Sequence, residues 1–391
     1  MKLAPFFLAL ALLFAPVTAI AKEIAWTDEE CAAYLIADMN GQILAEKGAD
    51  TPRKIASISK VMTYLLVKDA IAEGKLSLDT ELTVSAHAAS TFGSSAYLEE
   101  GETLTVSDLL DAMMIISAND AASVLAEGVA TTEDAFAKMM EAKGRELGFS
   151  HVHFVNASGL PQDETEDENE VTTKDLYKLA HEVITKYPEV LDYRDKHSFK
   201  HGETEIDSTM KLYGVYPGVD GLKTGYTEFA GCCLLTTVDM KAATGKPEDD
   251  YRLIAVIMGA KSVDARAELT VELIDWAREH YEKKTLVDPA EAIRHEEQGK
   301  SIPAHPESAA YALVKKGTQI ESEDAFEITF PVEKGVRIGT RTVRAGGEVL
   351  ATVPLIADED VSNYKGFEAI KARVRYFFTT LEELYRLNDA A

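Results

Sequence analysis

The amino-acid sequence predicts a mixed α/β (α+β) protein with two domains, the second of them all-β, followed by a C-terminal amphipathic helix. Three patterns support this prediction. Helix-like and strand-like apolar patterns are mixed up to about residue 284, short alternating segments run from about 300 to 355, and apolar residues recur every three or four positions after residue 364. A chain of 391 residues, 46% of them hydrophobic, is long enough to bury a core in each domain.

The N-terminus indicates an exported protein. Met1-Lys2 precede an apolar stretch, 3–17, and Ala19-Ile20-Ala21 has the A-x-A pattern of a signal-peptide cleavage site. We therefore expect residues 1–21 to be a signal peptide. An uncleaved membrane anchor is the alternative, although the apolar stretch is short for a spanning helix of about 20 residues.

The charge balance excludes one class of function. Asp and Glu outnumber Lys and Arg by 66 to 40, which gives a formal net charge of −26. Because affinity for phosphate backbones comes from Lys and Arg, we expect no nucleic-acid partner. An even spread of this charge would also disfavour contact with an anionic membrane.

In the first domain we expect a hairpin, four helices and two later strands. Asn40-Gly41 lies between the apolar runs 32–37 and 42–47, which is a strong hairpin signal. Helices are expected at 58–73, from Ser107 to about 116, at 133–147 and at 263–283, and strands at Cys232–Val238 and Leu253–Met258.

The three cysteines, Cys31, Cys232 and Cys233, are expected to be free thiols. Their number is odd, and vicinal cysteines do not readily bridge each other because disulfide geometry is demanding. A buried thiol on a strand behaves as a small apolar side chain.

The hydrophobic pattern of the sequence changes near Asp288-Pro289 to short alternating segments, and we expect a small all-β domain at 285–360. Its short alternating segments are Ala310–Val314, Ala325–Val332, Val336–Ile338 and Glu348–Val353.

A serine and a lysine at the start of the first helix suggest nucleophilic catalysis. Ser57 and Lys60 are three residues apart, so their side chains lie on one helix face, one turn apart. A serine hydroxyl needs a base within hydrogen-bond reach, and a lysine can serve if burial or a second cation lowers its pKa. The helix N-terminus adds donors for a developing oxyanion.

Two further motifs complement this pair. Ser117-Ala118-Asn119 follows an apolar run, and Lys223-Thr224-Gly225 is expected immediately before a strand. Together they supply a second hydroxyl for proton relay, an amide to hold a peptide backbone, and a cation to face a carboxylate.

With these motifs in this order, the chain resembles the low-molecular-mass penicillin-binding proteins that are serine-type D-alanyl-D-alanine carboxypeptidases. The resemblance covers residues 25–285 and includes the blocks Ala56–Thr63, Gly93–Ser95 with Glu100–Glu102, Ser117–Ala121, His153–Asn156 with Gly159-Leu160, and Asp220–Thr227. It implies a β-lactamase/transpeptidase-like domain at 22–284, in which helices flank an antiparallel sheet, and a small β domain after it.

The resemblance also implies a role for each catalytic residue. Ser57 is expected to be the acylated nucleophile and Lys60 its general base, while Ser117 relays a proton to the leaving D-alanine and Asn119 orients the peptide. The backbone N–H groups of Ser57 and Tyr226 are expected to form the oxyanion hole. The proton transfers need neither a metal nor an organic cofactor.

For substrate binding, the resemblance implies the strand block Lys223, Thr224, Gly225 and Tyr226, with Lys223 and Thr224 at the terminal carboxylate. Arg266 matches a family arginine near that carboxylate, and a structural ion pair with Glu268 or a neighbour is the alternative. The implied partners are peptidoglycan stem peptides ending in D-Ala-D-Ala, and β-lactam antibiotics as covalent inhibitors.

Two segments depart from the family pattern. Ser208–Tyr213 replaces an Asn-x-Asn-like stretch and a basic residue, so substrate contacts from this segment are in doubt. Gln162–Glu170 carries six acidic residues and reads as an inserted, solvated surface loop rather than a cation site.

Three alternatives stay open at this point. A class A β-lactamase shares two of the motifs, but its Glu-x-x-Leu-Asn-like segment has no counterpart between Asn119 and Lys223. His151 and His153, if they alternate on a strand, could hold the zinc ion of a metallopeptidase, although no third ligand stands out. A non-catalytic cell-wall-binding protein is disfavoured by the intact motifs.

The last segment, 361–391, is expected to form a membrane-associating amphipathic helix, with packing on the β domain or in an oligomer as the alternative. Its apolar residues fall on one face: Phe367, Ile370, Val374, Phe377, Phe378, Leu381, Leu384 and Tyr385. Between 364 and 386 basic residues outnumber acidic ones, which suits a membrane surface. The sequence thus predicts a protein attached peripherally to the outer, periplasmic face of the cytoplasmic membrane.

Overall fold

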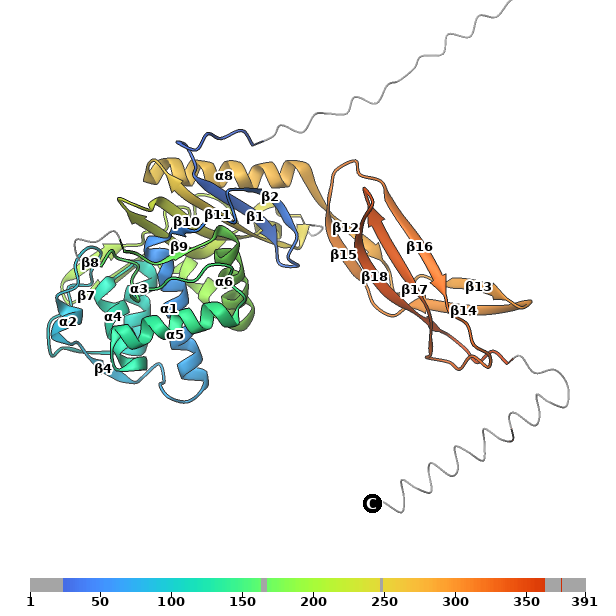
Figure 1. The fold of residues 1–391 in the computed structure, drawn as a ribbon, viewed down its shortest axis with the longest axis horizontal. Helices are drawn as coiled ribbons and strands as arrows, with labels where there is room; N and C mark the ends of the chain where they lie inside the picture. Colours follow the sequence, from blue (N-terminus) through green and yellow to red (C-terminus); the bar gives the residue numbers. More distant parts are fainter. Residues whose placement is uncertain (1–23, 163–166, 247–248, 363–373, 375–391) are drawn as a thin grey trace, which may run out of the picture.

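The computed structural model describes residues 24–162, 167–246 and 249–362, together with residue 374. Figure 1 shows two bodies, a helix-and-sheet domain and an elongated β domain, joined where helix α8 (Val263–His280) continues into strand β12 (Tyr281–Val287). The expected mixed fold, with antiparallel sheets and an all-β C-terminal domain, is confirmed. The expected signal peptide lies outside the described residues, as does almost all of the expected C-terminal helix.

A five-stranded antiparallel sheet is the centre of the first domain. Its strand order is β2-β1-β11-β10-β9. The strands are β1 (Ala33–Asp38), β2 (Ile43–Lys47), β9 (Val219–Thr227), β10 (Gly231–Asp239) and β11 (Arg252–Ala260). The predicted hairpin is confirmed as β1 and β2, and β1 then pairs with β11 from the far end of the domain.

Both faces of this sheet are covered. On β11, Ile254, Val256 and Met258 contribute to the core on one face, and Leu253, Ala255 and Ile257 contribute to the core on the other. The second face packs against α8, which runs along it in Figure 1. Two-sided burial explains why β11 reads as a continuous apolar run rather than an alternating one.

The first face carries the other helices. They are α1 (Lys60–Ala72), α2 (Ala86–Ala89), α3 (Val106–Ile115), α4 (Asn119–Ala130), α5 (Glu133–Glu146) and α6 (Thr173–Lys186). The short helix α7 (Met240–Thr244) follows β10 and adds Met240 to the core on the α8 face. Two 3-10 turns, η1 (Ala56–Ser59) and η2 (Pro188–Asp195), complete the helical set. Helix α1 is buried almost all round, from Lys60 to Val67, so it runs through the core of the domain.

The first domain also contains short two-stranded sheets: β3 (Arg53–Lys54) with β6 (Glu170–Val171), β4 (Glu81–Thr83) with β5 (Thr103–Thr105), and β7 (Ser198–His201) with β8 (Thr204–Asp207). The three cysteines are buried free thiols, as predicted.

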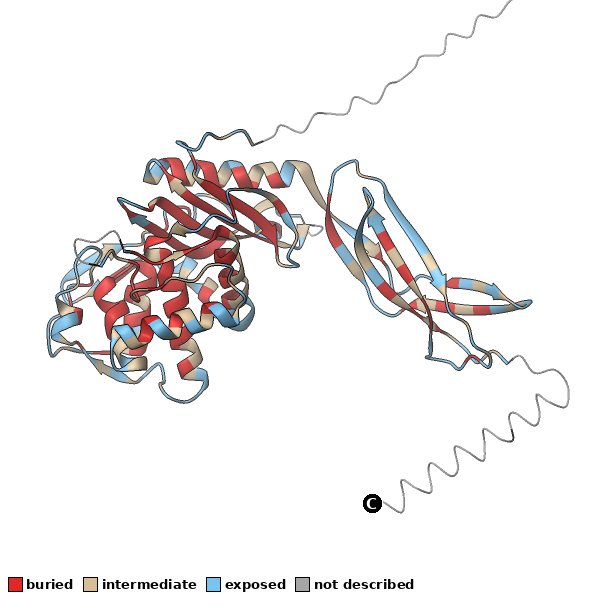
Figure 2. Cartoon of the chain, in the orientation of Figure 1, coloured by how far each residue is buried: buried red, intermediate tan, exposed pale blue. Residues whose placement is uncertain are grey.

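The β domain has a thinner core. Its strands β13 (Ile293–Glu297), β14 (Lys300–Pro306), β16 (Ile320–Phe326), β17 (Arg337–Ala345) and β18 (Glu348–Ala357) form a sheet of order β13-β14-β18-β17-β16, and β12 pairs with β15 (Ala310–Lys315). In Figure 2 buried and exposed residues alternate along these strands, whereas the first domain's sheet is mostly buried. The rings of His295 and Phe326, one from each edge strand, stack with centroids 3.9 Å apart.

Three predicted boundaries are wrong. Lys223-Thr224-Gly225 lies inside β9 rather than before a strand. Helix α8 ends at His280, so 281–283 belong to a strand, and 327–332 are not part of one. None of the described helices combines the length and the apolar character needed to cross a membrane.

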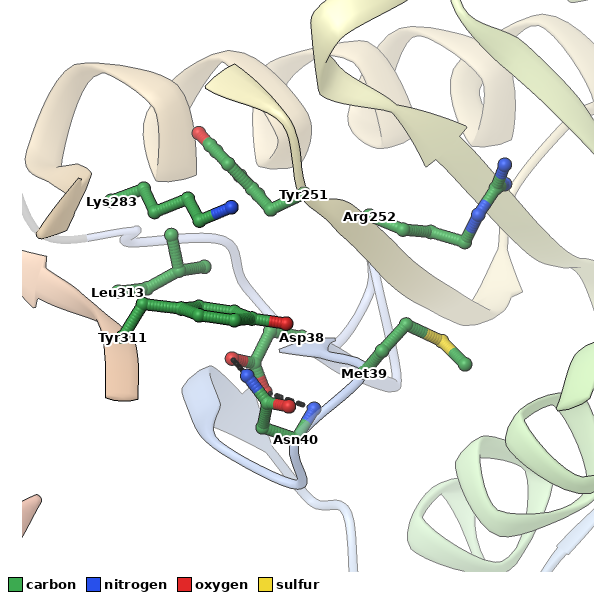
Figure 3. A pocket seen from close by; sticks show the side chains of 8 residues that line it. All are labelled: Asp38, Met39, Asn40, Tyr251, Arg252, Lys283, Tyr311 and Leu313. Atoms are coloured by element: carbon green, nitrogen blue, oxygen red, sulfur yellow. Dashed lines mark hydrogen bonds between the residues drawn. The ribbon is translucent and has the colours of Figure 1, made fainter. Parts of the chain in front are cut away.

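The hairpin of the first domain contacts the β domain directly. Gln42 Nε2 donates a 2.8 Å hydrogen bond to the Leu313 carbonyl, and the Tyr281 hydroxyl donates to the Leu44 carbonyl at 3.2 Å. A cavity of about 50 Å³ lies at this junction, and Figure 3 shows the side chains that line it, from Asp38, Met39, Asn40, Tyr251, Arg252, Lys283, Tyr311 and Leu313. The β domain is therefore held at a definite place on the sheet edge.

Candidate active site

The expected nucleophile lies in a tight turn beside a buried lysine. Ser57 is half-buried in η1, and Lys60 is fully buried at the start of α1. Lys60 Nζ lies 2.8 Å from Ser57 Oγ, 2.7 Å from Asn119 Oδ1 and 2.8 Å from the Ser158 carbonyl oxygen. The first two sequence motifs are thus brought together by one amine.

The electrostatic setting favours a neutral Lys60. Burial is the largest effect and lowers the pKa of Lys60 well below its usual value, and the nearby Lys223 cation lowers it further. The carboxylates of Glu133 and Asp120 act in the opposite direction but more weakly. Among the described residues the partners of Lys60 Nζ are a hydroxyl, an amide oxygen and a backbone carbonyl, none of them a carboxylate.

The Ser117–Asn119 segment links α3 to α4 at a backbone bend. Ser117 has a φ of +65°, and Asn119 begins α4 while its N–H donates to the Ser94 carbonyl at 2.7 Å. Asn119 Nδ2 donates to the Phe92 carbonyl at 2.7 Å, which orients the amide so that its oxygen faces Lys60. Ser117 is 4% exposed, and its hydroxyl makes no hydrogen bond within the described part of the chain.

The third motif reaches the nucleophile along strand β9, at the outer edge of the sheet. Gly225 packs directly on η1, because a Cβ atom there would lie 2.8 Å from the Ile55 carbonyl oxygen and 3.3 Å from the Ile58 nitrogen. Only glycine permits this approach. Lys223 is buried and Tyr226, at 62% exposure, points to solvent.

Two buried cations lie beside this strand. Burial, and then the Arg266 charge, lowers the pKa of Lys223 to about 7. Arg266 Nη1, from α8, donates to the carbonyls of Gly225 and Cys233 at 3.1 and 3.3 Å. Neither cation forms an ion pair among the described residues, and the alternative pairing of Arg266 with Glu268 does not occur there. The pair can therefore receive an external anion.

Some contacts of the site carry no signal in the sequence. The acceptor on Ser158 is its backbone carbonyl, which any residue type could supply. Glu133 Oε1 holds this segment in place by accepting the Ala157 N–H at 2.9 Å. Thr209, in the segment that departs from the family pattern, accepts a 3.0 Å hydrogen bond from the Thr224 hydroxyl. That segment therefore still contacts the site.

The two histidines considered as zinc ligands are engaged elsewhere. His151 and His153 do not lie on a named strand, and their Nε2 atoms lie 3.1 Å from Glu170 and 2.6 Å from Asp167. Within the described ranges, no group of three or more His, Cys, Asp or Glu side chains could hold a metal ion.

A serine next to a buried lysine, an amide on that lysine, and two unpaired cations on the adjacent strand define an active-site serine enzyme that transfers acyl groups from carboxylate-bearing substrates. Comparison with known proteins agrees. Residues 20–262 match the family described as D-alanyl-D-alanine carboxypeptidase, and residues 279–363 match the penicillin-binding protein 5 C-terminal domain. The chain belongs to the D-alanyl-D-alanine carboxypeptidase family and is a serine hydrolase.

The similarity extends over both domains. D-alanyl-D-alanine carboxypeptidase DacF of Bacillus subtilis is 33% identical over 368 residues, which span 90% of this chain and 91% of the relative. The structure of a peptidoglycan synthesis regulatory factor, PBP3 of Streptococcus pneumoniae, matches with a TM-score of 0.68 at 27% identity, over 85% of this chain and 99% of that one. Penicillin-binding protein D2 of Listeria monocytogenes, in its ampicillin-bound form, matches with a TM-score of 0.56 at 33% identity, over 63% and 96%.

Proposed function

We propose that Ser57 and Lys60 carry out the D-alanyl-D-alanine carboxypeptidase reaction, which removes the terminal D-alanine from peptidoglycan stem peptides. The observation that carries this assignment is the set of three contacts of Lys60 Nζ. A neutral amine has two N–H bonds and one lone pair. Asn119 Oδ1 and the Ser158 carbonyl accept the two N–H bonds, which leaves the lone pair for the Ser57 hydroxyl proton.

In the acylation step, Ser57 Oγ attacks the carbonyl carbon of the penultimate D-alanine, and its proton moves to Lys60 Nζ. The negative charge on the substrate oxygen is stabilised by the backbone N–H groups of Ser57 and Tyr226. The C–N bond then breaks, and the leaving D-alanine takes the proton from Lys60 through the Ser117 hydroxyl. Lys60 is neutral again and the peptide is an ester on Ser57.

Deacylation uses the same groups with water. Lys60 accepts a proton from water as its oxygen attacks the ester carbon, and Ser57 Oγ regains that proton when the C–O bond breaks. In both steps Asn119 holds the peptide backbone. During acylation Lys223, Thr224 and Arg266 bind the terminal carboxylate beside Gly225, and this carboxylate leaves with the D-alanine. The buried, unpaired state of the two cations supports this role.

β-Lactams should acylate the same serine, and the ampicillin-bound structure of the Listeria monocytogenes relative supports this expectation. Mass spectrometry of the intact protein after penicillin treatment should find one adduct, located on the Ser57 peptide. Ser57→Ala should remove the adduct while the circular dichroism spectrum stays unchanged. An adduct on another residue would overturn the assignment, and rapid penicillin turnover in place of a slowly decaying ester would favour the β-lactamase alternative.

We also propose that the protein is exported and attached to the outer face of the cytoplasmic membrane, with residues 22–284 as the catalytic domain and 285–360 as a spacer. The support is the signal-like pattern of residues 1–21 and the basic, amphipathic pattern of 361–391. Truncation after Asn363 should release the protein into the soluble fraction of lysed cells. If the truncated protein still sediments with membranes, the anchor lies elsewhere.

A further inference from the structure

One acidic residue of the Gln162–Glu170 segment is buried next to the catalytic strand. Glu168 is 1% exposed, and its Oε2 accepts a 2.8 Å hydrogen bond from the hydroxyl of Thr227. Thr227 follows Tyr226 directly, and its oxygen in turn accepts the Ala230 N–H at 3.0 Å. The neighbouring acids Asp167 and Glu170 instead bind surface histidines. Glu168 therefore has a different role from the acids around it.

The residues after Glu168 hold the chain that leads to the nucleophile. The Asn169 carbonyl accepts the Ile55 N–H at 3.1 Å, and Glu170 pairs with Lys54 in the β3–β6 ladder. Ile55 lies two residues before Ser57. A stretch of three residues thus contacts both the strand that follows Tyr226 and the segment that precedes Ser57.

Burial of this carboxylate has a cost that the local contacts only partly offset. Its second oxygen, Oε1, is buried and has no hydrogen-bond partner among the described residues. Burial raises the pKa of Glu168, while the Thr227 hydrogen bond and the Lys54 charge oppose this. The Lys54 ammonium itself lies over the Phe229 ring, 4.2 Å from its centroid. A neutral side chain would avoid the cost of burying a carboxylate at this position.

We propose that Glu168 is a positioning residue for the oxyanion hole: by holding the Thr227 hydroxyl, it fixes the end of β9 so that the Tyr226 N–H stays opposite the Ser57 N–H. Because Gly225 packs closely on η1, the positions of the Ser57 and Tyr226 N–H groups depend directly on each other. A small displacement of the strand end therefore changes the distance between them. This inference rests on the roles proposed above for Ser57 and Tyr226.

The test compares Glu168→Ala with Glu168→Gln and with Asp167→Asn, a matched change to the adjacent exposed acid. Removal of a whole oxyanion donor lowers rates by about 10²–10³-fold. A misplaced donor should lower kcat by roughly 10–100-fold in Glu168→Ala, with KM little changed, because the oxyanion exists only in the transition state. Penicillin acylation and deacylation should slow to a similar degree. Glu168→Gln keeps an oxygen for Thr227 and should recover most of the rate, and Asp167→Asn should match the wild type.

A second variant guards against a folding defect. Thr227→Val removes the same hydrogen bond from the other side, together with the acceptor of the Ala230 N–H, so its loss should be at least that of Glu168→Ala. The double variant should lose no more than Thr227→Val alone. Wild-type rates in a folded Glu168→Ala protein, or equal losses in the alanine and glutamine variants, would overturn the inference. Failure of the wild type to form the Ser57 adduct would instead overturn the assignment of the nucleophile.

Discussion

Lys60 Nζ and the carbonyl oxygen of Ser158 lie 2.8 Å apart, although the two residues are 98 positions apart in the sequence. This contact and the Asn119 amide determine how the lysine amine is oriented toward Ser57. Both acceptors are rigidly held. Asn119 is fixed by Phe92, and the segment before Ser158 is fixed by Glu133.

The first prediction concerns the acid side of the pH profile. In the proposed mechanism Lys60 must be neutral to accept the Ser57 proton, so kcat/KM should fall as the pH drops through the pKa of this lysine. Glu133 raises that pKa, so Glu133→Gln should lower it further and move the loss of activity to lower pH, with the plateau rate retained. The exposed neighbour supplies the control, Asp134→Asn, whose profile should match the wild type. A shift of the Glu133→Gln profile toward higher pH would contradict this electrostatic account.

A second prediction concerns the alkaline side and substrate binding. Because the pKa of Lys223 is about 7 in the free enzyme, its cation is lost above that pH. KM for a peptide with a free carboxylate should therefore rise up to about tenfold per pH unit above 7. Bound carboxylate stabilises the cation, so kcat should be less affected. A substrate with an amidated C-terminus should show no such rise, and a rise with both substrates would exclude this role of Lys223.

Arg266 should contribute to binding through its charge. Arg266→Gln should lower kcat/KM for a carboxylate-bearing peptide by about 10–100-fold, the range of one charge-assisted hydrogen bond. Arg278, an exposed arginine on the same helix that pairs with Asp275, offers the control Arg278→Gln, which should have no effect. Acylation by a β-lactam ester, which lacks the anion, should fall much less. Equal losses for the acid and the ester would mean that Arg266 only supports the strand.

Gly159 should be intolerant of any side chain. Its φ is +81°, and a methyl group there would overlap the Ala56 carbonyl oxygen, next to Ser57. Gly202 has a φ of +56° with open space around it, so Gly202→Ala should cost only about 1–2 kcal/mol of backbone strain. Gly159→Ala should cost at least about 3 kcal/mol in urea unfolding, or abolish folding. Similar free energies of unfolding for the two variants would show that the backbone around Ala56 can move to make room for a methyl group, which would contradict this prediction.

Sequence reasoning found the side chains of the site because their types and spacing report chemistry. Ser57, Lys60 and Asn119 meet as expected, and Gly225 lies against the nucleophile's turn. The Ser158 carbonyl could not be foreseen, since a backbone acceptor leaves no mark on the residue type. Glu168 could not be recognised from the sequence, because it lies in a run of acidic residues that are mostly on the surface. Only the folded structure shows that this one acidic side chain is buried.

The errors in element boundaries also have physical causes. Lys223 and Gly225 interrupt the apolar pattern of β9, so the strand was expected only after them. Tyr281 to Lys283 contain no helix breaker, and their pairing with β15 decides their conformation. Such long-range pairing is invisible to a local pattern.

The stack of His295 on Phe326 joins the two outermost strands of the β domain's sheet. An unpaired strand edge is a template on which a strand of another chain can pair. The ring stack holds the two edge strands to each other, and charged residues on β16, such as Glu321 and Glu323, also oppose such pairing. Copies of the protein at high local concentration should therefore be less prone to exchange strands or to aggregate through the β domain.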